Sequence, residues 1–262
     1  MNYYIVDAFT DHVFSGNPAA VLILDQWLSD EVMQKIATEN NLSETAFAVK
    51  TGADYQLRWF TPGAEIDLCG HATLATGYIL LNGQEKAAAE VRFHAKSGLL
   101  TVRRAEGRYE MDLPALRPEP YHVTEQLVKA LGGLRPVEVF KKRDLVVLLE
   151  SEEQLRALTP DLEAMKQLPE GLAVFVTAPS ADPRYDFADR AFWPKLCIDE
   201  DPVCGSAHCN LAPYWGEKLG KKTMVAHQVS QRGGVLYLED CGDRVKVSGH
   251  AALYAEGEIF HI

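Results

Sequence analysis

The residue best suited to acid–base chemistry is Glu44, in the segment LSETAF at residues 42–47. The segment lies between a predicted helix end and an apolar strand, so we expect this carboxylate to be partly withdrawn from water. Withdrawal from water raises the pKa of a carboxyl group toward the range of a general base. The residue type and its setting therefore indicate proton transfer, with a solvated loop glutamate as the alternative.

Two cysteines each precede a glycine at a predicted helix start, in the pairs Cys69-Gly70 and Cys204-Gly205. A thiol just before a helix start lies where the pKa of a thiol is usually lowered. Two such thiols would form a two-base racemase. Ordinary structural thiols are the alternative.

Two further titratable residues accompany the cysteines. His71 follows Gly70 and could act as an acid and base or simply cap its helix. Asp201 ends the acidic run DED at residues 199–201 and could position a polar group of a substrate. Acids before a helix are also favoured by the helix dipole alone, so the second reading stays open.

The two cysteines belong to a longer internal repeat. RWFTP at residues 58–62 is followed six residues later by CGHA, and RAFWP at residues 190–194 is followed nine residues later by CGSA. Cys69 and Cys204 are 135 positions apart in a chain of 262 residues. We interpret this as a tandem duplication, with coincidence as the alternative. The free N–H groups of two helix starts would suit a carboxylate or a developing enolate.

The elements that must position these residues follow from hydrophobic periodicity and turn signals. Helices are predicted at residues 29–39, 71–81, 124–131, 152–158 and 206–219. Strands are predicted at residues 3–9, 19–24, 45–50, 55–60, 91–94, 99–103, 109–113, 137–140, 145–149, 172–177, 185–192, 225–231, 235–238, 244–248 and 251–262. Strands with isolated helices favour an α+β fold over a doubly wound sheet.

A proline-rich stretch divides the pattern. Pro114, Pro118 and Pro120 fall within seven residues, which is typical of a linker. We therefore expect an N-terminal domain at residues 1–114, completed by the last strand at about 252–262, and a C-terminal domain at residues 115–251.

Composition excludes several classes of function. The net charge of −11 disfavours a nucleic-acid or anionic-membrane partner, and no apolar run approaches the length of a membrane span. No secretory leader is evident, so a cytoplasmic location with reduced thiols is expected. Cys197, Cys204, His208 and Cys209 do not have the spacing of a common zinc site, and no motif for ATP, NAD or PLP occurs. We therefore predict neither metal nor cofactor.

Four segments together resemble the PhzF (phenazine biosynthesis-like) family, which has the diaminopimelate epimerase fold. They are FSGNPAAV at residues 14–21, LSETAF at 42–47, FTP at 60–62 with LCGHAT at 68–73, and DPVCGSAH at 201–208. The resemblance implies two domains of like topology, each a curled, mostly antiparallel sheet around a central helix, with the active site between them. It also implies a cofactor-independent isomerase of a small, carboxylate-bearing, cyclic substrate, usually a homodimer.

The resemblance further implies a role for individual residues. Glu44 would take and return the proton, while Ser43, His71 and Asp201 would orient it and the substrate. The backbone at Gly70-His71 and Gly205-Ser206 would bind polar groups of the substrate.

One departure from the family pattern matters for mechanism. The phenazine enzyme has threonine where this chain has Cys204, so both residues before the helix-start glycines are thiols. Diaminopimelate epimerase and proline racemase carry the same thiol pair. A two-thiol racemase using Cys69 and Cys204 is therefore an alternative to the Glu44 mechanism, and a non-catalytic binding protein of the same fold is a third.

Overall fold

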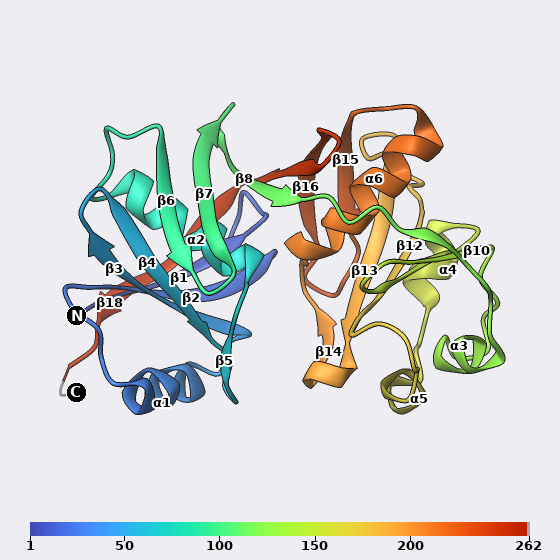
Figure 1. Cartoon of the computed structure of the whole chain (residues 1–262), viewed down its shortest axis with the longest axis horizontal. Helices are drawn as coiled ribbons and strands as arrows, with labels where there is room; N and C mark the ends of the chain where they lie inside the picture. Colours follow the sequence, from blue (N-terminus) through green and yellow to red (C-terminus); the bar gives the residue numbers. More distant parts are fainter. Residues whose placement is uncertain (261–262) are drawn as a thin grey trace. The chain divides into compact units, whose positions relative to one another are not determined.

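The protein is described by a computed structural model over residues 1–260, and the last two residues of the predicted final strand lie outside the described residues. The chain divides into two compact units (Figure 1). Unit 1 consists of Met1–Asp112 and the segment from Ser248 onward, and unit 2 consists of Leu113–Val247.

Unit 1 combines a mixed sheet with the helices α1 and α2. Its elements are β1 (Asn2–Ala8), β2 (Asn17–Leu24), α1 (Asp30–Asn40), β3 (Glu44–Thr51), β4 (Asp54–Phe60), β5 (Glu65–Ile66), α2 (Gly70–Asn82), β6 (Glu90–Ala95), β7 (Gly98–Ala105), β8 (Arg108–Pro114) and β18 (Ala251–Glu258).

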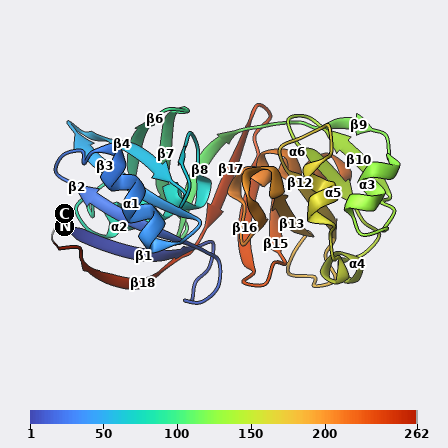
Figure 2. The same ribbon diagram turned by 90° about the horizontal axis from the view of Figure 1, so that it is seen from below.

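The sheet of unit 1 curls around α2. β1 pairs antiparallel with β2 and with β18, which lies alongside it in Figure 2. β2 runs parallel to β3, β3 antiparallel to β4, β4 parallel to β6, and β6, β7 and β8 form an antiparallel meander. The helix α2 packs against β1, β2, β3, β6 and β7. It therefore forms the centre of the unit.

The sequence of α2 explains this central position, because the helix is apolar or small on every side. Nine of its thirteen residues are buried, from His71 to Leu81. A helix without a polar face is stable only when its whole circumference is covered. Gly77 permits the closest approach, since a Cβ built there would lie 2.5 Å from a side-chain carbon of Val102 on β7.

The helix α1 covers another part of the same sheet and has regular ends. Ser29 caps it by accepting a hydrogen bond from the N–H of Val32, and Asn41 ends it in the left-handed conformation. Its buried residues Met33 and Ile36 join Phe47 and other side chains of the sheet in one apolar cluster. This packing anchors the chain immediately before β3.

Unit 2 repeats the plan with different helices. Its elements are β9 (Glu119–Tyr121), α3 (Glu125–Ala130), β10 (Glu138–Lys141), β11 (Leu145–Leu148), α4 (Glu152–Ala157), α5 (Leu162–Lys166), β12 (Val174–Pro179), β13 (Phe187–Trp193), the 3-10 turn η1 (Pro194–Leu196), β14 (Ile198–Asp201), the 3-10 turn η2 (Gly205–Ala207), α6 (His208–Leu219), β15 (Thr223–Gln228), β16 (Gly234–Asp240) and β17 (Arg244–Gly249).

Strand pairing in unit 2 follows the order of unit 1. β10 and β11 are antiparallel, β11 and β12 parallel, β12 and β13 antiparallel, and β13 and β15 parallel. These pairs correspond in turn to β1–β2, β2–β3, β3–β4 and β4–β6 of unit 1. The helix α6 packs on β15 and β16 and is buried from His208 to Gly216. The expected α+β class, with two similar halves built around central helices, is confirmed.

Local structure differs from the sequence predictions at three points. The proline-rich stretch, predicted as a linker, also contains the strand β9, with Pro120 opposite Phe140 on β10. The α-helix predicted at about residues 206–219 begins at His208, after a 3-10 turn. The acidic run at residues 199–201, predicted to precede a helix, forms most of the strand β14. The short elements β5 and α5 were not anticipated.

Candidate functional site

In unit 1, Glu44 and His71 form a buried acid–base pair. Glu44 is the first residue of β3, and His71 is the second residue of α2. They are 5% and 4% exposed, and Oε2 of Glu44 lies 3.1 Å from Nε2 of His71. The distance is that of a hydrogen bond, although the ring is not aligned for one. Because β3 packs against α2, the first strand residue meets the first helical turn.

Asn17 orients the imidazole from its other side. Its Nδ2 lies 3.1 Å from Nδ1 of His71, and the side chain is fully buried at the start of β2. An amide N–H can only donate, so Nδ1 accepts and the ring proton is assigned to Nε2, facing Glu44. Asn17 lies in the segment FSGNPAAV, and no role in the site was predicted for it. The parallel pairing of β2 with β3 brings it there, since Ala19 on β2 is opposite Glu44.

Cys69 completes the group in unit 1. It is the N-cap residue of α2, is 6% exposed, and places Sγ 3.5 Å from Nδ1 of His71. Its carbonyl accepts hydrogen bonds from both the N–H and the hydroxyl of Thr73. Ligand atoms of Glu44, Cys69 and His71 all lie within 4.8 Å of one another, so these side chains could also hold a metal ion. The sequence analysis considered a metal cluster only at residues 197–209.

The other predicted residues of unit 1 lie beside this pair. Ser43 is half-buried immediately before β3, and Gly70 is the first residue of α2. The N–H groups in the first turn of a helix have no acceptor within the helix, and the helix dipole makes this end positive. The start of α2 can therefore bind an anionic group.

In unit 2, Asp201 and Cys204 are held by Gln228. Its Nε2 donates to the carbonyl of Asp201 at 2.7 Å, and its Oε1 accepts from the N–H of Cys204 at 2.8 Å. Gln228 is the last residue of β15 and is fully buried. It was missed in the sequence analysis because its contacts depend on strand pairing that no local motif signals.

The Cys204 thiol differs from the expectation for a helix start. It is 3% exposed, and its Sγ lies 3.4 Å from Oγ of the half-buried Ser206. Burial raises the pKa of this thiol well above its ordinary value, and the negative charge of Asp201 raises it further. The expected lowering of its pKa is therefore wrong, and the thiol is protonated near neutral pH. Gly205 beside it is buried within η2.

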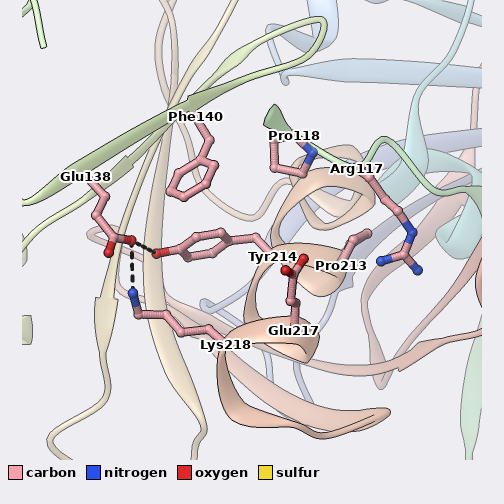
Figure 3. A pocket seen from close by; sticks show the side chains of 8 residues that line it. All are labelled: Arg117, Pro118, Glu138, Phe140, Pro213, Tyr214, Glu217 and Lys218. Atoms are coloured by element: carbon pink, nitrogen blue, oxygen red, sulfur yellow. Dashed lines mark hydrogen bonds and ion pairs between the residues drawn. The ribbon is translucent and has the colours of Figure 1, made fainter. Parts of the chain in front are cut away.

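A separate surface cavity of about 250 Å³ lies in unit 2 between β10 and α6 (Figure 3). Tyr214 and Phe140 form an aromatic wall, and Glu138 accepts hydrogen bonds from the Tyr214 hydroxyl and from Lys218, each at 2.9 Å. These hydrogen bonds lower the pKa of Glu138. No predicted site residue lines this cavity, Glu138 and Lys218 form an ion pair within it, and Arg117 pairs with Asp240 outside it.

A model of the phenazine biosynthesis-like (PhzC-PhzF) family matches residues 6–257, nearly the whole chain. The chain belongs to the PhzF family. It is 49% identical over 260 residues to an uncharacterized isomerase of Pseudomonas aeruginosa, covering 99% of this chain and 98% of the relative.

Solved structures of PhzF relatives agree with the fold. A PhzF-family protein of Enterococcus faecalis superposes with a TM-score of 0.96 at 50% identity, covering 99% of both chains. A predicted epimerase of Pseudomonas aeruginosa superposes with a TM-score of 0.72 at 25% identity, covering 100% of this chain and 99% of the other. The fold is thus that of PhzF proteins and epimerases, and this PhzF protein is an enzyme of the isomerase class. No helix among residues 1–260 is both long and apolar enough to cross a bilayer.

Proposed function

We propose that this PhzF protein moves a proton between two carbons of a small, carboxylate-bearing, cyclic and amino-acid-like substrate, with Glu44 as the proton carrier. The observation that carries the proposal is the buried contact between Glu44 and His71, held in place by Asn17. A carboxylate with one directed N–H neighbour in a dry setting is suited to accept a proton from carbon and to return it.

The proposed reaction conserves protons and electrons without a second reactant. The Glu44 carboxylate removes a proton from a substrate carbon, and the electron pair of the broken C–H bond is delocalised into the adjacent unsaturated system. Glu44 is then a neutral carboxylic acid. It returns the same proton to a second carbon of that system, so the carboxylate is regenerated and the product is an isomer. No oxidant, reductant or cofactor is needed.

His71 acts on the carboxylate rather than on the substrate. Its Nε2 faces Oε2 of Glu44 at 3.1 Å, so it fixes the direction of the carboxylate. Ser43 precedes Glu44 in the chain, and the first-turn N–H groups at Gly70 and His71 belong to the helix start that carries the imidazole. We assign them to polar groups of the substrate, where helix-start N–H groups would stabilise developing negative charge.

Unit 2 contributes polar binding groups in this proposal. Asp201 is assigned to an amino or hydroxyl group of the substrate, and the backbone at Gly205 and Ser206 to an anionic oxygen. The support is that Gln228 fixes the segment between Asp201 and Cys204 at two points. A segment fixed at two points keeps its polar groups in a constant direction, which is what substrate orientation requires.

The two-thiol racemase is the weaker candidate. That mechanism requires one thiol of the Cys69–Cys204 pair to be ionised while the other is protonated. Burial and Asp201 both disfavour the thiolate of Cys204. A neutral Cys204 would suit only the proton-donating half of such a cycle.

We also propose that the protein acts without a cofactor, as a homodimer, in the cytoplasm. The support for the compartment is that all five cysteines are free, as expected where thiols are kept reduced. The homodimer rests on the family resemblance, and sedimentation equilibrium of the purified chain tests it directly.

Deuterium exchange tests the assignment of Glu44. A panel of cyclic amino-acid-like carboxylates is incubated with enzyme in heavy water, and deuterium incorporation at carbon is followed by proton NMR. Glu44→Gln keeps the size of the side chain but removes the base, so we expect exchange to fall by about a thousandfold, within the range for general base catalysis. Cys204→Ser is the matched control and should retain most of the exchange.

The opposite pattern would overturn the assignment. If Cys204→Ser abolishes exchange while Glu44→Gln retains it, the two-thiol racemase is favoured. If the wild-type protein binds the compounds tightly but exchanges no proton, the non-catalytic binding protein is favoured.

A further inference from the structure

A second carboxylate–imidazole pair lies in unit 2, beside the turn that contains Gly205 and Ser206. Asp189 on β13 and His208 at the start of α6 are both fully buried, and Oδ1 of Asp189 lies 3.3 Å from Nε2 of His208. The imidazole ring stacks on Phe187, with ring centroids 6.0 Å apart. No group in residues 1–260 donates a hydrogen bond of normal geometry to either carboxylate oxygen of Asp189. His208 is therefore its main polar neighbour.

The proton arrangement of this pair follows from its other contact. Nδ1 of His208 lies 2.9 Å from the carbonyl oxygen of Cys204. A carbonyl can only accept, so Nδ1 carries a proton and donates it. Asp189 lies against the other ring nitrogen, with Oδ1 3.3 Å from Nε2. Asp189 thereby keeps the ring in the orientation in which Nδ1–H points at Cys204.

The backbone of Cys204 is consequently held at both its N–H and its carbonyl. Gln228 accepts from the N–H, and His208 donates to the carbonyl. Asp189 and Gln228 are direct partners in the parallel pairing of β13 with β15, so their side chains leave the same face of the sheet. Two neighbouring strand residues thus fix the backbone of one residue, Gln228 directly and Asp189 through the imidazole.

The equivalent turn of unit 1, at Cys69, has no such carboxylate–imidazole pair and shows how the backbone folds in its absence. Leu57, Thr73 and Ala95 occupy the positions that correspond to Asp189, His208 and Gln228 in the strand registers and in the Cys-Gly repeat. Thr73 donates both its N–H and its hydroxyl to the carbonyl of Cys69, and the α-helix begins at once.

In unit 2 the imidazole of His208 forms the hydrogen bond to the corresponding carbonyl, that of Cys204. The N–H of His208 bonds to the carbonyls of Gly205 and Ser206, and residues 205–207 wind as a 3-10 turn before α6 begins. The residue four positions after the cysteine therefore determines how the Gly205–Ala207 turn is wound and where its N–H groups point.

We propose that Asp189 and His208 are positioning residues that fix the carbonyl of Cys204 and so direct the backbone N–H groups of Gly205 and Ser206 toward the substrate. This inference rests on the proposed function for the substrate-binding role of those N–H groups. The positioning itself depends only on contacts within unit 2.

Isosteric substitutions separate positioning from simple packing. Asp189→Leu is combined in turn with His208→Asn, His208→Gln and His208→Thr, so that no buried carboxylate is left without a neighbour. Asparagine places an N–H donor where Nδ1 stood, and glutamine places one where Nε2 stood. Asp189→Leu with His208→Thr reproduces the residues of unit 1. Thermal unfolding confirms that each double variant is folded before comparison.

Amide hydrogen exchange of Gly205 and Ser206, read by NMR on the full chain, is the primary measurement because it needs no substrate. We expect exchange rates within about threefold of wild type in the asparagine variant. In the glutamine and threonine variants we expect changes of at least tenfold. Equal rates in all three variants and the wild type would overturn the proposal.

Binding of pyrrole-2-carboxylate, a planar cyclic carboxylate, is the second measurement. The dissociation constant should rise at least tenfold in the glutamine and threonine variants and stay near wild type in the asparagine variant. If wild type does not bind this probe, the carboxylate-binding role of the proposed function fails, while amide exchange still decides the positioning. If Glu44→Gln retains proton transfer, the assignment of Glu44 as proton carrier is wrong. If the His208→Asn and His208→Gln double variants still differ in amide exchange, the positioning role of Asp189 and His208 stands.

Discussion

Arg58 in unit 1 and Arg190 in unit 2 share two contacts, a paired glutamate and a stacked phenylalanine. Each guanidinium forms two hydrogen bonds to one glutamate, Arg58 to Glu65 at 2.7 and 2.9 Å and Arg190 to Glu200 at 2.8 Å twice. Each also stacks on the phenylalanine two residues later, at 5.2 and 5.0 Å from the ring centre. The framework of the repeat is therefore retained down to side-chain geometry.

The polar residues around the Cys-Gly turns have diverged instead. Register places Ala173 of unit 2 where unit 1 has Glu44, because Thr45 is opposite Phe60 and Val174 is opposite Phe192. In the Cys-Gly repeat, Ser206 corresponds to His71. Unit 2 thus has no base at the position of Glu44, and unit 1 has no counterpart of the Asp189–His208 pair. In the proposed mechanism the shared scaffold would carry the proton-transfer residue in unit 1 and further substrate-binding groups in unit 2.

Substitutions at His71 and at Ser206 test this division of roles most directly. His71→Asn removes the N–H donor that faces Glu44, so we expect deuterium exchange into substrate to fall about a hundredfold, in the range for loss of a group that supports a general base. Ser206→Ala should lower exchange by less than tenfold. His71→Gln, which restores a donor near Nε2, should recover part of the rate. A larger loss in Ser206→Ala than in His71→Asn would reverse the assignment.

Thiol reactivity tests the environment of unit 2. Cys204 is buried and its pKa is raised, whereas Cys197 and Cys241 are exposed. Iodoacetamide at pH 8 should therefore modify Cys204 at least about a hundredfold more slowly than Cys197, because only the thiolate reacts. Peptide mass spectrometry over time measures each rate.

Asp201→Asn sharpens this result, because it removes the charge that contributes to the raised pKa of Cys204. The alkylation rate of Cys204 should then increase several-fold while that of Cys197 stays constant. Alkylation of Cys204 as fast as Cys197 in the wild type would restore the two-thiol mechanism as the leading candidate.

Much of the framework could be predicted because its signals are local. The apolar run that becomes α2, the Cys-Gly pairs and the segment around Glu44 each lie within a few consecutive residues. The contact between Glu44 and His71 could be anticipated only through the family resemblance. It joins the start of a strand to the start of a helix 27 positions later.

The residues that escaped prediction act through long-range pairing. Asn17 reaches His71 through β2–β3 pairing, and Gln228 reaches Cys204 across 24 positions. The strand β9 was missed for a different reason, since proline usually marks a break. It is tolerated because β9 pairs with β10 at an edge, where a missing N–H costs no ladder hydrogen bond.

Packing of the central helices offers a third comparison. Gly77 of α2 corresponds to Ala212 of α6, seven residues after the respective helix-start glycines. Gly77→Ala would place a methyl group within 3 Å of three atoms of the buried Val102, so we expect a loss of about 2 kcal/mol in the free energy of unfolding. Ala212→Gly should cost about 1 kcal/mol through backbone entropy, and somewhat more in total because the methyl group it removes is fully buried. Urea denaturation measures both variants. Combining Gly77→Ala with Val102→Ala should relieve the contact, and failure to do so would contradict the packing explanation.

The Arg58–Glu65 pair gives the smallest expected effect and a defined pH window. Hydrogen bonds from Arg58 lower the pKa of Glu65 from 4.5 to about 2. A folded-state pKa below the unfolded value stabilises the fold above pH 4.5, and this stabilisation is lost as the pH falls from 4.5 toward 2. Partial exposure screens the pair, so we expect Glu65→Gln to cost about 1 kcal/mol at pH 7 and to flatten the stability profile below pH 4.5. Urea denaturation between pH 2.5 and 7 measures how stability changes with pH. Glu90→Gln, at an exposed residue that begins β6, is the control. If the stability of Glu65→Gln changes with pH in parallel with that of the wild type, the Arg58–Glu65 pair positions the strands without contributing to acid sensitivity.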